Sequence, residues 1–235
     1  MLPEERRGEI VATFLKMEAF VPEGKNGASI GEMARKAVET ADRLSVATDA
    51  LMPVLRTALV INWKESAMKS RYERFRCKFP EITTLAALKD ALDKAEPVHF
   101  CEHYLRINAT NEQNPKYKLL KGLTKGFLDY QRDQGIGSEI EAIRHWAAHV
   151  DVARLDADPI GGIRGVGPGV VGNIRLNLGL DAIKPDRHVI GVMKQHLLLD
   201  VPHHCYGKVA EWLGIGKRRF DEVLFRYGQA HGISG

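Results

Sequence analysis

The stretch that decides the fold is residues 157–178, which read ADPIGGIRGVGPGVVGNIRLNL. Its apolar residues and glycines predict a short helix over 156–163, a tight glycine turn and a second helix over 169–178. Such a helix-hairpin-helix reverses the chain within a few residues. The same glycines also fit an ordinary turn between two helices, so the stretch alone leaves a binding role and a purely structural role open.

The glycines of this hairpin would leave its backbone accessible to a partner. Gly165 and Gly167 supply backbone angles that are closed to other residues, and they allow close approach to the main chain. A helix that starts near Pro168 or Gly169 points unpaired N–H groups outward. Because these groups and the positive end of the helix dipole favour a phosphate, we predict phosphate binding at Gly165, Val166, Gly167 and Gly169.

Outside this stretch, apolar residues recur at helical spacing almost everywhere, and no run shows the sustained alternation of a β-strand. Breaks fall where turn-forming residues concentrate, for example at 22–27 and 111–115. The sequence therefore predicts an all-α fold. We expect helices at about 4–19, 28–45, 49–62, 64–78, 83–93, 98–106, 116–134, 138–150, 156–163, 169–178, 186–198, 206–212 and 217–230.

The composition is that of an ordinary globular protein with a modest basic excess. Of its 235 residues, 44% are hydrophobic and 27% are charged, enough for one large domain or two small lobes around a core. No apolar run approaches the roughly 20 residues that span a bilayer, and the first residues lack the apolar stretch of a secretory signal. We therefore expect a cytoplasmic protein that binds no membrane. A formal charge of +4 is compatible with a nucleic-acid partner without requiring one.

The cysteines and histidines do not predict a metal site. Cys77, Cys101 and Cys205 form an odd, widely spaced set, which argues for reduced thiols rather than a disulfide framework or a thiolate metal site. The nine histidines, including His203 and His204, lack convincing ligand partners for a divalent metal. We expect that no cofactor is required.

A carboxylate follows the hairpin. Asp186, within the stretch IKPDRHV at 183–189, lies 21 residues after Gly165. The helix predicted over 186–198 would place Asp186 at a helix N-terminus, where the dipole favours negative charge. Aspartate is among the best N-cap residues, so capping alone would explain its presence. A catalytic role needs the further observations that follow.

The hairpin followed by Asp-x-His-Val at 186–189 resembles the HhH-GPD superfamily of DNA glycosylases. That superfamily is named for its helix-hairpin-helix and its Gly/Pro-rich loop with aspartate, and it includes endonuclease III and adenine glycosylase. Three places depart from its pattern: Ile-Arg at 163–164 replaces Leu-Pro, Pro185 replaces a small apolar residue, and Arg187 replaces a small or β-branched one. Weaker likeness extends over roughly residues 50–230, at 59–66, 75–80, 119–125 and 220–228.

The resemblance implies a two-lobed all-α fold with the active-site cleft between the lobes. Residues 51–186 would form a central helical lobe that contains the hairpin, and residues 1–50 plus 187–235 would form a second helical lobe from both termini. Iron–sulfur members of the family carry four cysteines after their closing helix, whereas this chain has none after Cys205. We therefore expect no iron–sulfur cluster.

The resemblance also implies an activity: extrusion of a modified base from double-stranded DNA and hydrolysis of its N-glycosidic bond. Breaking that bond develops positive charge on the deoxyribose, which a fixed carboxylate stabilises while it orients the attacking water. Asp186 is the candidate for this catalytic role. Members that also cut the backbone carry a Schiff-base lysine where this chain has Gly169. We therefore predict a monofunctional enzyme, with Lys184 as the first alternative nucleophile.

Further DNA contacts are predicted by position. Trp63 aligns with the turn that bears the wedge in the resembling enzymes, and Asn62 could contact the orphan base, although a buried core tryptophan explains Trp63 as well. Lys184 either binds phosphate or is a solvated surface lysine, and His188 either lies near the DNA or stabilises its own helix. Other aromatic pocket candidates are Tyr72, Tyr104, Tyr117 and Trp146. The resemblance implies a Na⁺ or K⁺ ion held by the backbone carbonyls of Gly161, Ile163 and Val166.

Several alternatives stay open on the sequence alone. The hairpin could belong to a non-catalytic DNA-binding module, or the enzyme could be a bifunctional glycosylase and lyase that uses an unrecognised lysine. The base could be an alkylated or oxidised purine, a deaminated base or a bulkier modification. Modified phage DNA is included, which would make the protein a defence rather than a repair enzyme. We expect a monomer.

Overall fold

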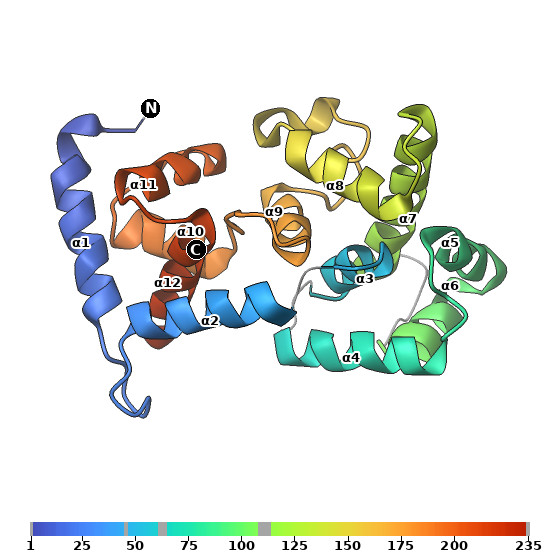
Figure 1. Ribbon diagram of the computed structural model, residues 1–235, viewed down its shortest axis with the longest axis horizontal. Coiled ribbons are helices and arrows are strands. Elements are labelled where there is room, and N and C mark those ends of the chain that lie inside the picture. The colour runs from blue at the N-terminus through green and yellow to red at the C-terminus, as the bar shows by residue number, and fades with distance from the viewer. Residues whose placement is uncertain (1, 45–46, 61–64, 108–113, 234–235) are drawn as a thin grey trace. The chain divides into compact units, whose positions relative to one another are not determined.

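The computed structural model describes residues 2–44, 47–60, 65–107 and 114–233, and the regular structure in these ranges is helical with no β-strand (Figure 1). This confirms the predicted all-α class. No helix in these ranges is long and apolar enough to cross a membrane. The elements are η1 (Glu4–Arg6), α1 (Arg7–Ala19), α2 (Ile30–Leu44), α3 (Leu51–Val60), α4 (Glu65–Lys78), α5 (Leu85–Lys94), α6 (Pro97–His99), the π-helix η2 (Phe100–Leu105), α7 (Pro115–Asp133), α8 (Glu139–His149), η3 (Val152–Ala157), α9 (Pro168–Asn177), α10 (Arg187–Gln195), η4 (His203–Cys205), α11 (Tyr206–Trp212) and α12 (Lys217–Ala230).

The chain divides into two compact units. The terminal unit comprises Met1–Val46 and Gly179–Gly235, and the central unit comprises Ala47–Leu178. Compared with the expected division at 50/51 and 186/187, residues 47–50 fall in the central unit. Residues 179–186 fall in the terminal unit. The reason is that α9 is followed by Gly179 at φ +76°, after which Ile183 packs against the apolar core of the terminal unit.

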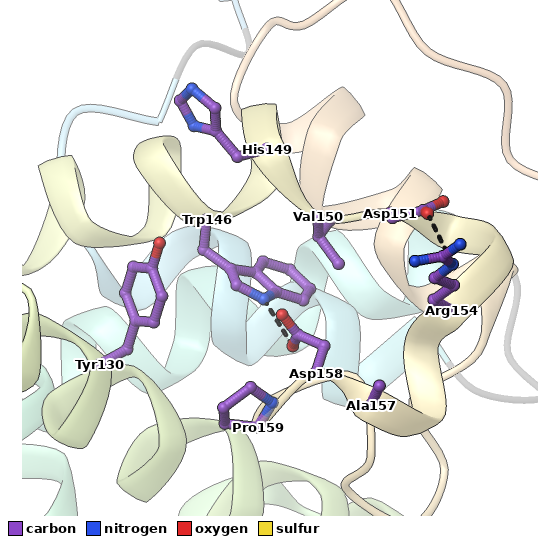
Figure 2. A pocket seen from close by; sticks show the side chains of 9 residues that line it. All are labelled: Tyr130, Trp146, His149, Val150, Asp151, Arg154, Ala157, Asp158 and Pro159. Carbon is purple, nitrogen blue, oxygen red and sulfur yellow. Dashed lines mark hydrogen bonds and ion pairs between the residues drawn. The ribbon is translucent and has the colours of Figure 1, made fainter.

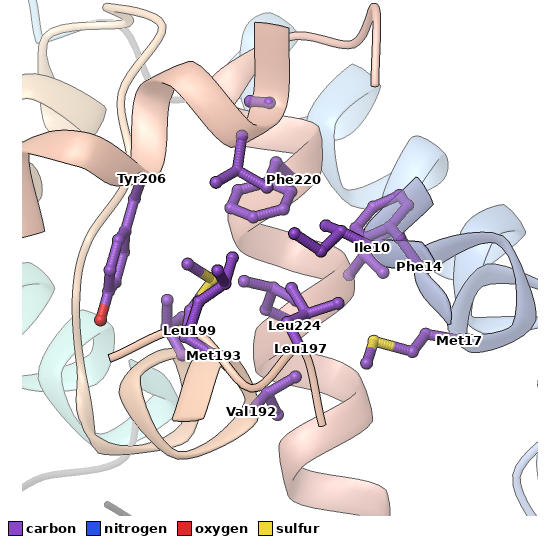
Figure 3. Packing of buried hydrophobic residues seen from close by; sticks show 14 of the residues in the cluster. Ile10, Phe14, Met17, Val192, Met193, Leu197, Leu199, Tyr206, Phe220 and Leu224 are labelled. Carbon is purple, nitrogen blue, oxygen red and sulfur yellow. The ribbon is translucent and has the colours of Figure 1, made fainter. Parts of the chain in front are cut away.

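The terminal unit has one apolar core, to which α1, α2, α10, α11 and α12 all contribute (Figure 3). Ile10, Phe14 and Met17 recur at helical spacing along α1, and all three are buried. Phe14 stacks on Phe220 of α12, with ring centroids 5.4 Å apart. On its other sides α12 packs against α2 and α10. The core therefore fixes α10 and α12 against each other.

In the central unit, polar contacts hold α9 in place. Asn173 of α9 donates from Nδ2 to Thr57 Oγ1 of α3 at 2.8 Å, and both side chains are buried. The Arg175 guanidinium donates to the carbonyls of Ala147 and Val150, at 2.7 and 3.0 Å, and so satisfies the C-terminus of α8. The second helix of the hairpin is thus bound to two neighbouring helices by specific hydrogen bonds.

The helix expected over 156–163 is wrong. The structure has the 3₁₀-helix η3 at Val152–Ala157, and residues 158–165 form successive turns. Asp158 explains the difference, because its Oδ1 accepts the N–H groups of Ile160 and Gly161 at 2.9 and 2.6 Å. The same oxygen accepts the Trp146 indole N–H at 2.9 Å, which ties the turn to α8.

The hairpin also rests on two glycines of α7. A Cβ at Gly122 would lie 2.6 Å from Ile163 Cγ2, and a Cβ at Gly126 would lie 2.9 Å from Ile163 Cδ1. One turn apart on the helix, these glycines form a shallow seat that receives the Ile163 side chain. The close approach of α7 to the hairpin therefore requires glycine at both positions.

Gly122→Ala should destabilise the protein even though alanine favours a helix by about 1 kcal/mol over glycine. The Ile163 methyl belongs to a β-branched side chain that cannot swing away, so overpacking at 2.6 Å outweighs the helix gain and leaves a net loss of about 1 kcal/mol. Urea denaturation would measure this loss in the free energy of unfolding. The control is Gly8→Ala in α1, where a Cβ meets no described atom within 4 Å and stability should not fall. If Gly122→Ala were as stable as the wild type, the close packing of Ile163 would not require glycine at position 122.

Candidate functional site

The hairpin turn requires glycine at one of its two expected positions. Gly165 has φ +98°, in the left-handed region, and the N–H of Val166 donates to the carbonyl of Ile163 at 2.8 Å to close the turn. Gly167 has φ −141°, an extended conformation open to any residue, so the expected conformational role of Gly167 is wrong. A Cβ there would meet no described atom within 4 Å. Gly167 therefore leaves open space beside the turn.

The start of α9 carries no cap from the described side chains. Gly167 is its N-cap residue and Pro168 its first residue, followed by Gly169. By contrast, Ser138 Oγ accepts a first-turn N–H of α8, and Thr84 does the same for α5. Pro168 has no N–H, and the N–H of Val170 donates to the Gly167 carbonyl at 2.9 Å, so an anion at this helix start would bind the N–H groups of Gly167 and Gly169.

Asp186 is the N-cap of α10, as its place in the sequence predicted. Its Oδ1 accepts the N–H groups of His188 and Val189, at 2.9 and 3.0 Å, and the residue is half-buried. Both bonds use the same oxygen, so Oδ2 takes no part in the cap. The arrangement fixes one oxygen of the carboxylate and leaves the other for a different contact.

A short turn leads into this cap. The N–H of Asp186 donates to the carbonyl of Lys184 at 2.7 Å, and the N–H of Lys184 donates to Asp221 Oδ1 at 2.8 Å. Asp221 lies on α12 and is buried, and this burial raises the pKa of its carboxyl well above the ordinary 3.8. Sequence reasoning missed Asp221, because nothing in its local pattern distinguishes it from a solvent-facing aspartate.

His188 is tied to the C-terminal end of the chain. Its Nδ1 donates to the carbonyl of Ile233 at 2.7 Å, and its ring meets Phe225 edge-on with centroids 5.5 Å apart. These contacts favour the helix-stabilising role over the DNA contact. Because Nδ1 is bonded to Ile233, any DNA contact by the ring of His188 would use Nε2.

Lys116 is a second residue that sequence reasoning missed. It is buried at the start of α7, and its Nζ donates to the carbonyl of Leu59 near the C-terminus of α3 at 3.1 Å. Burial, and then the charge of Arg71, lowers the pKa of Lys116 to about 8. An amine with that pKa is partly neutral near physiological pH, which a nucleophile requires. No sequence signal marks it, since its burial depends on contact with α3.

The carbonyls expected to hold a monovalent cation belong to the hairpin turns. The Ile163 carbonyl accepts the N–H of Val166 at 2.8 Å, so one of its two lone pairs is already used. Gly161 is buried in the Asp158 turn, and Val166 follows Gly165. Elsewhere in the described ranges, no group of three or more His, Cys, Asp or Glu side chains could hold a metal ion. The three cysteines are free thiols.

The aromatic candidates fall into different environments. Asn62 and Trp63 lie outside the described residues. Tyr117 is buried and donates its hydroxyl to the Leu92 carbonyl at 3.4 Å, which gives it a core role. Tyr104 stacks on Phe79, with ring centroids 4.2 Å apart. Of the other aromatic candidates, Tyr72 is half-buried on α4 and Trp146 is buried on α8.

A cavity of about 250 Å³ lies beside the first half of the hairpin (Figure 2). Trp146 and Asp158 form part of its wall and bond to each other there. Arg154 approaches Asp151 to 3.9 Å at one side, and the Tyr130 hydroxyl bonds to His145 Nδ1 at 2.7 Å. The polar groups around the cavity therefore bond among themselves, and we assign it no ligand.

The structure brings the predicted site residues together in two groups. Gly165 to Gly169 form one turn of the central unit, whereas Lys184, Asp186 and His188 lie in one turn of the terminal unit. Compared with known proteins, the chain matches no family model, no curated protein and no solved structure.

Asp221→Asn should change how stability depends on pH. Because the pKa of Asp221 is raised above 3.8, the stabilising contribution of its proton is present at acid pH and is lost as the pH rises. Asparagine keeps an acceptor oxygen for Lys184 and does not titrate. The melting temperature of Asp221→Asn relative to the wild type should therefore rise as the pH increases above the ordinary carboxyl pKa of 3.8. A melting-temperature difference that does not change with pH would contradict this role. The control is Asp151→Asn, which replaces an exposed aspartate.

Proposed function

We propose that this chain is a monofunctional DNA glycosylase of the HhH-GPD type, which extrudes a modified base from double-stranded DNA and hydrolyses its N-glycosidic bond. The observation that carries the proposal is the contrast between two successive helices. α9 begins at the glycine hairpin without a side-chain cap, and α10 begins at the Asp186 carboxylate. The all-α class and the two compact units are compatible with the HhH-GPD fold, which we also propose.

The hairpin would bind one phosphate of the duplex. Gly165 sets the turn, and the open space at Gly167 would let a phosphate oxygen approach the N–H groups at the start of α9. Such a contact reads no base, so it would give affinity without sequence specificity. The formal charge of +4 supports the same kind of binding.

Asp186 would act on the extruded nucleotide. As the glycosidic bond lengthens, the deoxyribose becomes positively charged, and a carboxylate held in place stabilises that charge without reorganising. The bonds from His188 and Val189 hold Oδ1 of Asp186, which supports such a fixed position. The same carboxylate would orient the attacking water, whose oxygen bonds to C1′ of the sugar as the C1′–N bond breaks, while a proton of the water ends on the released base.

The absence of a lysine at Gly169 supports a water nucleophile. Gly169 stands where the resembling bifunctional enzymes carry their Schiff-base lysine. Two other lysines would be the candidates if the protein also cut the DNA backbone. Lys184 is two residues from Asp186, and Lys116 has a pKa lowered to about 8. Neither occupies the position of the family nucleophile, so we propose hydrolysis that leaves an abasic strand.

A non-catalytic helix-hairpin-helix module is the second candidate function. The observation that favours it is the cap itself, because two backbone bonds to Oδ1 give Asp186 a structural task that needs no chemistry. Such a module would bind double-stranded DNA through the same hairpin and leave it unchanged.

Asp186→Asn should separate these two functions. Asparagine Oδ1 can accept both N–H bonds of the cap, so the change removes the charge and keeps the helix start. We expect the single-turnover rate of base release to fall at least about 100-fold while DNA affinity stays within about threefold. Asp151→Asn is the matched control, since Asp151 Oδ1 likewise caps a helix, η3, through the N–H of Ala153 at 2.9 Å. A wild-type rate in Asp186→Asn would rule out the catalytic role.

A further inference from the structure

The loop that carries Asp186 is bound to α12 at two points. At its start, the Asp181 carboxylate accepts the N–H groups of the first two residues of α12, at 3.0 and 2.8 Å. Further along, Asp221 Oδ1 accepts the N–H of Lys184 at 2.8 Å. Because α12 packs against α10 through the core, the loop is anchored on a rigid helix.

Between Lys184 and Asp186 the chain makes one tight turn. The Asp186 N–H donates to the Lys184 carbonyl at 2.7 Å across Pro185, whose ring fixes a backbone angle. Lys184 thus donates to Asp221 with its N–H and accepts from Asp186 with its carbonyl. A single residue therefore links the two carboxyl groups, and a displacement of Lys184 would be passed to Asp186.

We propose that Asp221 is a positioning residue for Asp186: it holds the Lys184 N–H and thereby fixes the orientation of the Asp186 carboxylate. This role rests on the proposed function, in which Asp186 stabilises charge on the sugar. Stabilisation by a fixed charge depends on its placement, and a misplacement of about 1 Å can cost roughly a hundredfold in rate. The contribution of Asp221 therefore lies in the rate of base release rather than in DNA affinity.

The surroundings of Asp221 suit it to this task. The residue is 8% exposed and follows Phe220, which is fully buried, on the core side of α12. Burial is the largest cause of its raised pKa, opposed by the Lys184 hydrogen bond and reinforced by the charges of Asp186 and Glu222. The raised pKa favours the neutral carboxyl, and an oxygen of either the neutral or the charged form accepts the Lys184 N–H.

The test compares Asp221→Leu, which has similar volume and no acceptor, with Asp221→Asn, which keeps a carbonyl oxygen at the Oδ1 position. We expect Asp221→Leu to lower the single-turnover rate of base release about 100-fold, with DNA affinity within about threefold of the wild type. Asp221→Asn should restore the rate to within about threefold. The control is Glu222→Gln, which removes the neighbouring carboxylate that pairs with Arg226 at 2.9 Å and should leave the rate unchanged.

Amide hydrogen exchange gives a second readout that does not depend on activity. The N–H groups of His188 and Val189 bond to Asp186 Oδ1, so their protection from exchange reports the orientation of that carboxylate. We expect this protection to be lost in Asp221→Leu and kept in Asp221→Asn. A purely structural role elsewhere in α12 would leave these two amides unaffected.

The outcomes separate the inference from the function on which it rests. Wild-type protection and a wild-type rate in Asp221→Leu would overturn the positioning role. If the wild-type protein releases no base from any duplex, the proposed function fails, and the exchange of the His188 and Val189 amides alone decides whether Asp221 positions Asp186. Should Asp221→Leu fail to fold, Asp221→Ser takes its place, because a serine hydroxyl is too short to reach Lys184.

Discussion

Every α-helix leaves its first N–H groups without a partner inside the helix, and this constraint organises the rest of the structure. Thr84 and Ser138 satisfy it for α5 and α8, as ordinary caps do. Asp186 satisfies it for α10 with one oxygen, whereas α9 starts at a glycine with no described side chain. The start of α9 is thus open to an anion, and the start of α10 holds a carboxylate in place. In the proposed function, the start of α9 would bind a phosphate and Asp186 would stabilise charge on the sugar.

The start of α9 depends on contacts with residues of other helices. The hairpin is held by Asp158, which bonds to the Trp146 indole, and by Ile163, which fits against two glycines of α7. Asn173 then binds α9 to α3 through Thr57. Such specific contacts keep the hairpin backbone in one conformation, which in the proposed function would lower the entropic cost of binding a phosphate.

Most elements could be predicted from local pattern, whereas the contacts between them could not. Helical spacing gives the bounds of α11 and α12 as the structure has them, and the capping preference of aspartate predicts the role of Asp186. The helix expected over 156–163 fails because a side chain, Asp158, takes backbone N–H groups that a helix would use. Asp221 and Lys116 could not be predicted, because their hydrogen-bond partners lie far away in the sequence. The partner of Asp221 is 37 residues away, and that of Lys116 is 57 residues away. Burial of a charged group arises from tertiary packing, which local pattern does not contain.

Release of a free base from DNA tests the proposed function most directly. Wild-type protein would be incubated with a panel of duplexes, each carrying one modified base, and the products identified by mass spectrometry. We expect one class of duplex to yield its free base and an abasic strand that breaks only on treatment with alkali, with no adduct trapped by borohydride. Unchanged DNA across the panel would contradict glycosylase activity. Strand breaks without alkali and a trapped adduct that disappears in Lys116→Ala or Lys184→Ala would instead show a lysine nucleophile.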